Sequence, residues 1–120
     1  MARQISYKEK RVLKTTRHPF EILPHLGQIS KEVLFGDVWE RPELSKRDRS
    51  LATCAILAAQ YRTAELEYHM GLAIENGVTR EEMLALITHV AFYAGWPSAM
   101  NAGRVALDVL DKTGEGKRVE

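Results

Sequence analysis

Apolar residues recur three and four positions apart along most of this chain, which is the spacing of one face of an α-helix. The first such stretch covers about residues 24–39, with Ile29 and Val33 on one face. Arg41-Pro42 ends it, because proline disfavours helical backbone in the residue before it. No segment alternates apolar and polar residues in the manner of a strand. The pattern therefore predicts an all-α fold.

Four further helices are marked by the residues at their ends. Ser45 is the expected N-cap of a helix that continues to about residue 61. The next helix begins near Thr63 and ends at Asn76-Gly77, since glycine tolerates the left-handed backbone of a helix C-terminus. Thr79-Arg80-Glu81-Glu82 fits a capping box at the start of the fourth helix. Gly95-Trp96-Pro97 predicts a tight corner, with Pro97 in the first turn of the fifth helix.

The inward faces of these helices carry many small side chains. We expect the core to contain Leu51, Ala55, Ala58, Leu66, Met70, Ala73, Ile74, Leu84, Ile87, Ala91, Ala99, Ala102, Ala106 and Val109. Small side chains let helices pack closely, and a core of this kind in a short chain favours burial between subunits. We therefore expect an oligomer.

The composition agrees with one helical domain. The chain has 120 residues, of which 45% are hydrophobic and 28% charged. We expect that domain over residues 25–113, with a basic arm at 1–24 and a polar tail at 114–120; the arm is either solvated or packed on a neighbouring subunit. The net charge of +1 gives no reason to propose nucleic acid, and no apolar run is long enough for a membrane span or a secretory signal. The single Cys54 excludes an internal disulfide, so a cytoplasmic location is expected.

Glu65 and His69 are the first candidates for chemistry. They lie four residues apart on the third helix, beside its apolar stripe, so their side chains are neighbours at the margin of the core. A carboxylate there can orient the imidazole and raise its pKa, which would make a poised proton donor or base. The alternative is a surface pair worth about a few tenths of a kcal/mol.

Further polar residues could bind a ligand. His89 and Tyr93 have the same spacing on the fourth helix, and Asn101 lies early in the fifth. Arg47 and Arg49 begin the second helix, where they either hold a carboxylate or pair with Asp48 or Glu43. His89 could equally be a hydrogen-bonded core residue, and Asn101 could tie down the Gly-Trp-Pro corner.

Cysteine and metal chemistry have less support. Cys54 shares the face of Leu51, Ala55 and Ala58, which predicts an inert core thiol. Glu65, His69 and His89 could supply three ligands, but no spacing in the chain specifies a metal. We expect neither a metal nor another cofactor.

Several motifs in order resemble the carboxymuconolactone decarboxylase family, part of the wider group that includes the alkylhydroperoxidase AhpD. The resemblance covers about residues 34–110 and includes Phe35-Gly36-Asp37-Val38-Trp39-Glu40-Arg41-Pro42, Arg47-Asp48-Arg49-Ser50-Leu51, Glu65-Leu66-x-x-His69, Asn76-Gly77-Val78-Thr79-Arg80-Glu81-Glu82 and Tyr93-Ala94-Gly95-Trp96-Pro97. It implies an AhpD-like domain of about five to six helices, assembled as a trimer or hexamer.

The two branches of this group imply different reactions. The peroxidase branch uses a Cys-x-x-Cys pair, where this chain has Arg62 and Glu65. The decarboxylase branch implies a cofactor-independent carboxy-lyase acting on a small carboxylated lactone such as 4-carboxymuconolactone, from aromatic catabolism. It implies His69 as the acid, oriented by Glu65, with Arg49 on a substrate carboxylate.

His89, Tyr93 and Asn101 would then line the pocket or polarise the carbonyl. The chain departs from the decarboxylase pattern at Gly71, where an arginine is common, and at Gly103, where a bulkier residue is common. The alternatives are a peroxidase-like oxidoreductase and a non-enzymatic protein that binds a small acid.

Overall fold

The computed structural model describes residues 17–113 and, within them, the side chains of residues 17–110. Every regular element in this part of the chain is helical, as the sequence pattern predicts. Contacts divide the chain into two units, residues 1–41 and 42–120. No helix within residues 17–113 combines the length and apolar character that crossing a membrane requires.

The first unit contains four short elements, and the last three of them stand where a single helix was predicted over residues 24–39. These are η1 (Pro19–Glu21), α2 (Pro24–Ile29), η2 (Ser30–Leu34) and η3 (Val38–Glu40). The first two and the last are short turns of 3-10 or α-helix, and η2 is a π-helix. Residues 1–16 of the predicted arm lie outside the described residues.

The prediction of one continuous helix to residue 39 is wrong, because the chain passes from α-helix into a wider π-helix at Ser30–Leu34 and the helical run ends there. The Phe35 N–H donates to the Ser30 carbonyl (2.9 Å), the five-residue spacing of a π-turn. A Cβ atom added to Gly36 would stand 2.7 Å from the carbonyl oxygens of Lys31 and Glu32, so only glycine fits there. Trp39 is the one buried hydrophobic residue described in this unit.

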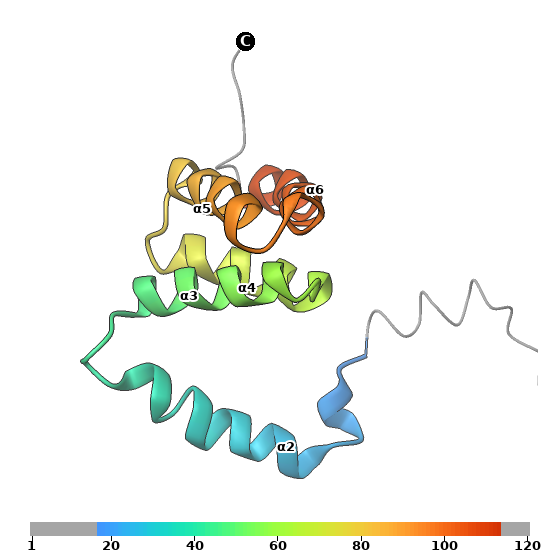
Figure 1. The fold of residues 1–120 in the computed structure, drawn as a ribbon. Helices are drawn as coiled ribbons and strands as arrows, with labels where there is room; N and C mark the ends of the chain where they lie inside the picture. The colour runs from blue at the N-terminus through green and yellow to red at the C-terminus, as the bar shows by residue number, and fades with distance from the viewer. Residues whose placement is uncertain (1–16, 114–120) are drawn as a thin grey trace, which may run out of the picture. The chain divides into compact units, whose positions relative to one another are not determined.

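The second unit consists of four longer helices: α3 (Lys46–Ala59), α4 (Thr63–Glu75), α5 (Arg80–Tyr93) and α6 (Trp96–Thr113). Figure 1 shows α5 and α6 side by side over α3 and α4. Contacts of α3 with α4 and α5, and of α6 with α4 and α5, close these two layers around one core.

Most of the predicted core is confirmed, but α5 faces the core with partly different residues from those predicted. Buried residues are Cys54, Ala58, Leu66, Met70, Ala73, Val78, Met83, Ile87, Val90, Ala102, Ala106, Val109 and Leu110. On α5 the inner stripe runs through Met83, Ile87 and Val90, whereas the predicted Leu84 and Ala91 are only partly buried. Helical periodicity alone fixes such a face only approximately.

The predicted helix starts are confirmed by their hydrogen bonds. The Ser45 hydroxyl accepts the Asp48 N–H (3.0 Å) at the start of α3. At the start of α5, the Thr79 hydroxyl accepts the Glu82 N–H (3.1 Å), and the Glu82 carboxylate accepts the Thr79 N–H (2.9 Å). Each bond satisfies a backbone donor that has no partner within its helix.

Two helix ends use the same backbone turn, but only one has a glycine. After α4, Gly77 has a φ of 103°, and the Val78 N–H donates to the Ala73 carbonyl (2.9 Å). After α3, Tyr61 takes the corresponding place with a φ of 60°. This helix therefore ends slightly before the predicted residue 61. The left-handed turn falls on a tyrosine, a residue type that gives no sequence signal for a helix end.

Candidate functional site

The Glu65–His69 pair lies on α4, at the edge of the core. His69 is partly buried and its Nδ1 atom is covered, while Glu65 is exposed. The Tyr68 ring meets the imidazole edge-on, with centroids 5.1 Å apart. The predicted position of His69 at the core margin is confirmed.

The effect of this setting on His69 differs from the expectation. Burial lowers the pKa of His69 below its ordinary value of 6.5, because desolvation penalises the charged imidazolium, and the Glu65 charge opposes this only in part. The predicted upward effect of the Glu65 carboxylate on this pKa is confirmed, but burial is the larger effect and gives the net shift the opposite direction. At neutral pH the imidazole is mainly in its uncharged form.

His89 and Tyr93 lie on α5, and both are exposed. Their rings pack against each other with centroids 4.7 Å apart and planes 30° apart. The alternative of His89 as a core residue is therefore wrong. Tyr93 is 82% exposed, so in a single chain its hydroxyl faces solvent.

His89 lines a groove between α3 and α5. Its volume is about 410 Å³, and it is lined by Arg47, Leu51, Ala55, Glu82, Ala85, Leu86, His89 and Val90. Arg47 forms an ion pair with Glu82 across the groove, and it also contacts the Asp48 carboxylate (3.1 Å). The sequence-based pairing of Arg47 with Asp48 is thus confirmed, whereas the pairing with Glu82 was not predicted.

Glu82 has two roles at this place. Its carboxylate accepts the Thr79 N–H in the capping box, and this hydrogen bond, with a contribution from Arg47, lowers the pKa of Glu82. The carboxylate therefore stays ionised well into the acidic range. It connects the first turn of α5 to the first turn of α3.

Arg49 does not line this groove. Its Nε atom donates to the Leu44 carbonyl (3.1 Å), which brings the side chain back toward the loop before α3. Of the two arginines that begin α3, Arg47 lines this groove and the predicted Arg49 does not.

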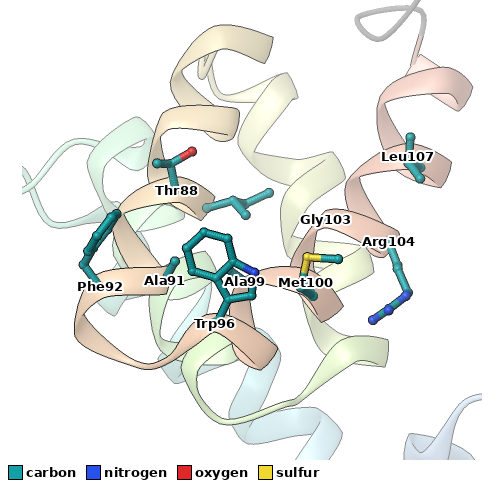
Figure 2. A pocket seen from close by; sticks show the side chains of 10 residues that line it. Thr88, Ala91, Phe92, Trp96, Ala99, Met100, Gly103, Arg104 and Leu107 are labelled. Carbon is teal, nitrogen blue, oxygen red and sulfur yellow. The ribbon is translucent and has the colours of Figure 1, made fainter.

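Asn101 lies on α6, where its side-chain oxygen accepts a hydrogen bond from Arg104 (3.1 Å). Arg104 borders a second groove, between α5 and α6, with a volume of about 520 Å³. Its lining is mostly apolar and consists of Ile87, Thr88, Ala91, Phe92, Trp96, Ala99, Met100, Gly103, Arg104 and Leu107. Figure 2 shows the Trp96 indole in the middle of these side chains, with Phe92 on one side and Leu107 on the other.

The predicted site residues do not share one of these grooves. His89 lines the α3–α5 groove, whereas Glu65, His69, Arg49, Tyr93 and Asn101 line neither groove. The sequence also missed Arg47 and Glu82 as partners, because they lie 35 positions apart and no local spacing rule connects them. The only available signal was that both stand in the first turn of a predicted helix.

Cys54 is fully buried, and burial raises the pKa of its thiol to about 12. The prediction of an inert core thiol is confirmed, since a thiol in this state supplies almost no thiolate at neutral pH. Within residues 17–113, no group of three or more His, Cys, Asp and Glu side chains is placed to hold a metal ion.

Comparisons with known proteins match the chain to one protein family and to two decarboxylases. The model of the carboxymuconolactone decarboxylase family matches residues 24–108. The chain is 41% identical over 80 residues to 4-carboxymuconolactone decarboxylase of Acinetobacter baylyi, an alignment covering 67% of this chain and 60% of that protein. It is 39% identical over 97 residues to nitrosuccinic acid decarboxylase npaB of Metarhizium robertsii, covering 78% of this chain and 67% of that protein. The chain therefore spans less than two thirds of the length of the first of these relatives.

Proposed function

The chain belongs to the carboxymuconolactone decarboxylase family, and we propose that it removes carbon dioxide from a small carboxylated compound without a cofactor. Both relatives are named as decarboxylases, although the compounds in their names differ. What the two names share is the loss of a carboxyl group from a small acid. A carboxylated lactone such as 4-carboxymuconolactone is the first substrate to test.

The chemistry needs a place for electrons and a source of a proton. When carbon dioxide leaves, the electron pair of the broken carbon–carbon bond flows through a conjugated system onto a carbonyl oxygen, which must be stabilised. A general acid then protonates the carbon, so the net reaction consumes one proton and releases carbon dioxide.

His69 is the acid in this proposal, and Glu65 orients it. The observation that carries the assignment is the placement of the imidazole at the edge of the core, four residues from a carboxylate whose charge acts on it. An anionic substrate beside His69 would favour its protonated form, opposing the effect of burial. The imidazolium would then stabilise the bound anion and deliver its proton as carbon dioxide leaves.

The rest of the site is proposed to come together in an assembly. Arg49, His89, Tyr93 and Asn101 are the proposed substrate-binding residues, and within one chain they share no described groove with His69. A trimer or hexamer would bring groups of one copy opposite His69 of the next. We expect this assembly in the cytoplasm.

Carbon dioxide release tests the proposal directly. Purified protein is incubated with 4-carboxymuconolactone and, separately, with nitrosuccinic acid, and release is compared with that of His69→Ala. We expect His69→Ala to keep the native helical content and to lose about two to four orders of magnitude in turnover.

Unchanged turnover in His69→Ala would exclude His69 as the acid. A small acid that binds to the native protein without any release of carbon dioxide would favour the non-enzymatic alternative. We do not propose a thiol peroxidase, because Cys54 is buried and the positions of the thiol pair are Arg62 and Glu65.

A further inference from the structure

The α3–α5 groove combines a cation, an imidazole and an apolar floor. Arg47 stands at its α3 side and His89 at its α5 side, with Leu51, Ala55 and Leu86 among the residues between them. Its volume of about 410 Å³ lies within the range of pockets that bind small organic molecules. The polar groups suit an anion, and the floor suits the carbon skeleton of a small acid.

We propose that Arg47 is the residue that binds a substrate carboxylate, in the α3–α5 groove, with His89 as the second polar contact. This inference rests on the proposed function only in taking the ligand to be a small carboxylic acid. It moves the carboxylate contact from Arg49 to Arg47, because Arg47 lines the groove and Arg49 directs Nε to the Leu44 carbonyl.

The structure already shows a carboxylate on Arg47. The Glu82 carboxylate pairs with the Arg47 guanidinium at this groove, so the position suits the ligand chemistry that we propose. A substrate carboxylate would exchange with Glu82 rather than add a new charge to an unpaired arginine. Glu82 therefore acts as a built-in competitor for the site.

This exchange costs little on the protein side. After release from Arg47, the Glu82 carboxylate keeps its hydrogen bond from the Thr79 N–H (2.9 Å). The side chain of Glu82 is also 41% accessible, so water can solvate the oxygen that Arg47 leaves. Arg47 in turn keeps its contact with the Asp48 carboxylate (3.1 Å), which helps to hold the guanidinium at the groove.

Two substitutions have opposite expected effects on the same ligand. Arg47→Gln removes the cation and should weaken the binding of succinate, a small dicarboxylate that serves as the probe, by about tenfold or more, the equivalent of one charge-assisted hydrogen bond. Glu82→Gln removes the competing charge but keeps a side chain that can complete a capping box. It should therefore tighten succinate binding several-fold.

Isothermal titration calorimetry on the full chain measures both effects. Arg41→Gln is the matched control, since Arg41 also pairs with a carboxylate, that of Asp37 (3.0 Å), but lies outside the groove. It should leave the affinity within about twofold of the wild-type value. Circular dichroism melting verifies that each variant is folded at the titration temperature, and Arg47→Met, which also removes the charge, replaces Arg47→Gln if the latter is not.

Any one of three results would overturn the inference. It fails if wild-type protein does not bind succinate, if the Arg47 variant binds it as wild type does, or if both variants weaken binding alike, as a purely structural pair would. Turnover separates this failure from that of the proposed function. If turnover depends on His69 but KM does not rise in the Arg47 variant, the inference about Arg47 is wrong and the proposed function stands. If the two variants change succinate binding in opposite directions but no turnover is found, the proposed decarboxylase activity is wrong and the inference stands.

Discussion

At the scale of single residues, His69 experiences two opposing influences on its protonation. Partial burial disfavours the imidazolium, and the neighbouring Glu65 favours it, with burial as the larger effect. The pair thus differs from an exposed ion pair on a helix, where solvent would leave only the weak attraction. A group set in this way responds strongly to an added negative charge, which a substrate would bring.

The pH dependence of turnover follows from this balance. If His69 is the acid, only its protonated form is active, so kcat/KM should fall as pH rises through a pKa below the ordinary 6.5. The measurement is kcat/KM between about pH 5 and 8. A rate that instead rises with pH across this range would contradict the role of His69 as the acid.

Cys54 allows a second prediction at this scale. Because burial raises the pKa of its thiol to about 12, the native protein should not react at neutral pH with an aromatic disulfide reagent that releases a coloured thiolate. In denaturing urea, one thiol per chain should react, and the variant Cys54→Ser should give no signal in either condition. Rapid reaction of the native protein would contradict the burial of this side chain.

At the scale of helices and their ends, two glycines near one another have opposite roles. Gly71 is inside α4, where an added Cβ would meet nothing within 4 Å of the described chain. Gly77 follows α4 with a φ of 103°, a backbone conformation that penalises any side chain. The sequence predicted the role of Gly77 as a helix end and identified Gly71 only as a departure from the family pattern.

Substitution by alanine distinguishes the two. Gly71→Ala should stabilise the fold by about 0.5–1 kcal/mol, since alanine favours helix, and Gly77→Ala should destabilise it by about 1–2 kcal/mol. Urea denaturation at one fixed protein concentration measures both. A loss of stability in Gly71→Ala would contradict the first expectation and indicate that another chain packs against this part of α4.

At the scale of the whole molecule, exposed apolar side chains gather along the α5–α6 groove. Phe92, Trp96 and Leu107 are 76%, 66% and 69% exposed in the single chain. Large apolar surfaces of this kind are typical of interaction sites. We propose that a neighbouring subunit covers these side chains in an oligomer.

The molar mass in solution tests that proposal. Light scattering on the purified protein should give three or six times the chain mass of 13.6 kDa. If the assembly is needed to complete the site, turnover should be lost at protein concentrations where this value falls. A mass of one chain at every concentration would rule out an assembled site and require His69 to act within a single subunit.

By itself, the sequence determined the helical class, most helix boundaries and much of the core. These features depend on local rules: Ser45 and Thr79 cap the helices that follow them, Gly77 ends α4, and Cys54 shares the face of Ala58. It also identified the family, because that depends on residues in order along the chain. It did not predict the π-helix at Ser30–Leu34, nor the close approach of Gly36 to the carbonyls of Lys31 and Glu32.

Only the tertiary structure decided which polar groups meet and how burial affects them. The pairing of Arg47 with Glu82 depends on the packing of α3 against α5, since spacing along the chain cannot relate residues on different helices. The direction of the His69 pKa likewise depends on burial, because charge neighbours can be read from helical spacing but loss of solvent cannot. Local propensity thus determined the elements, while packing between them determined the electrostatics of the candidate site.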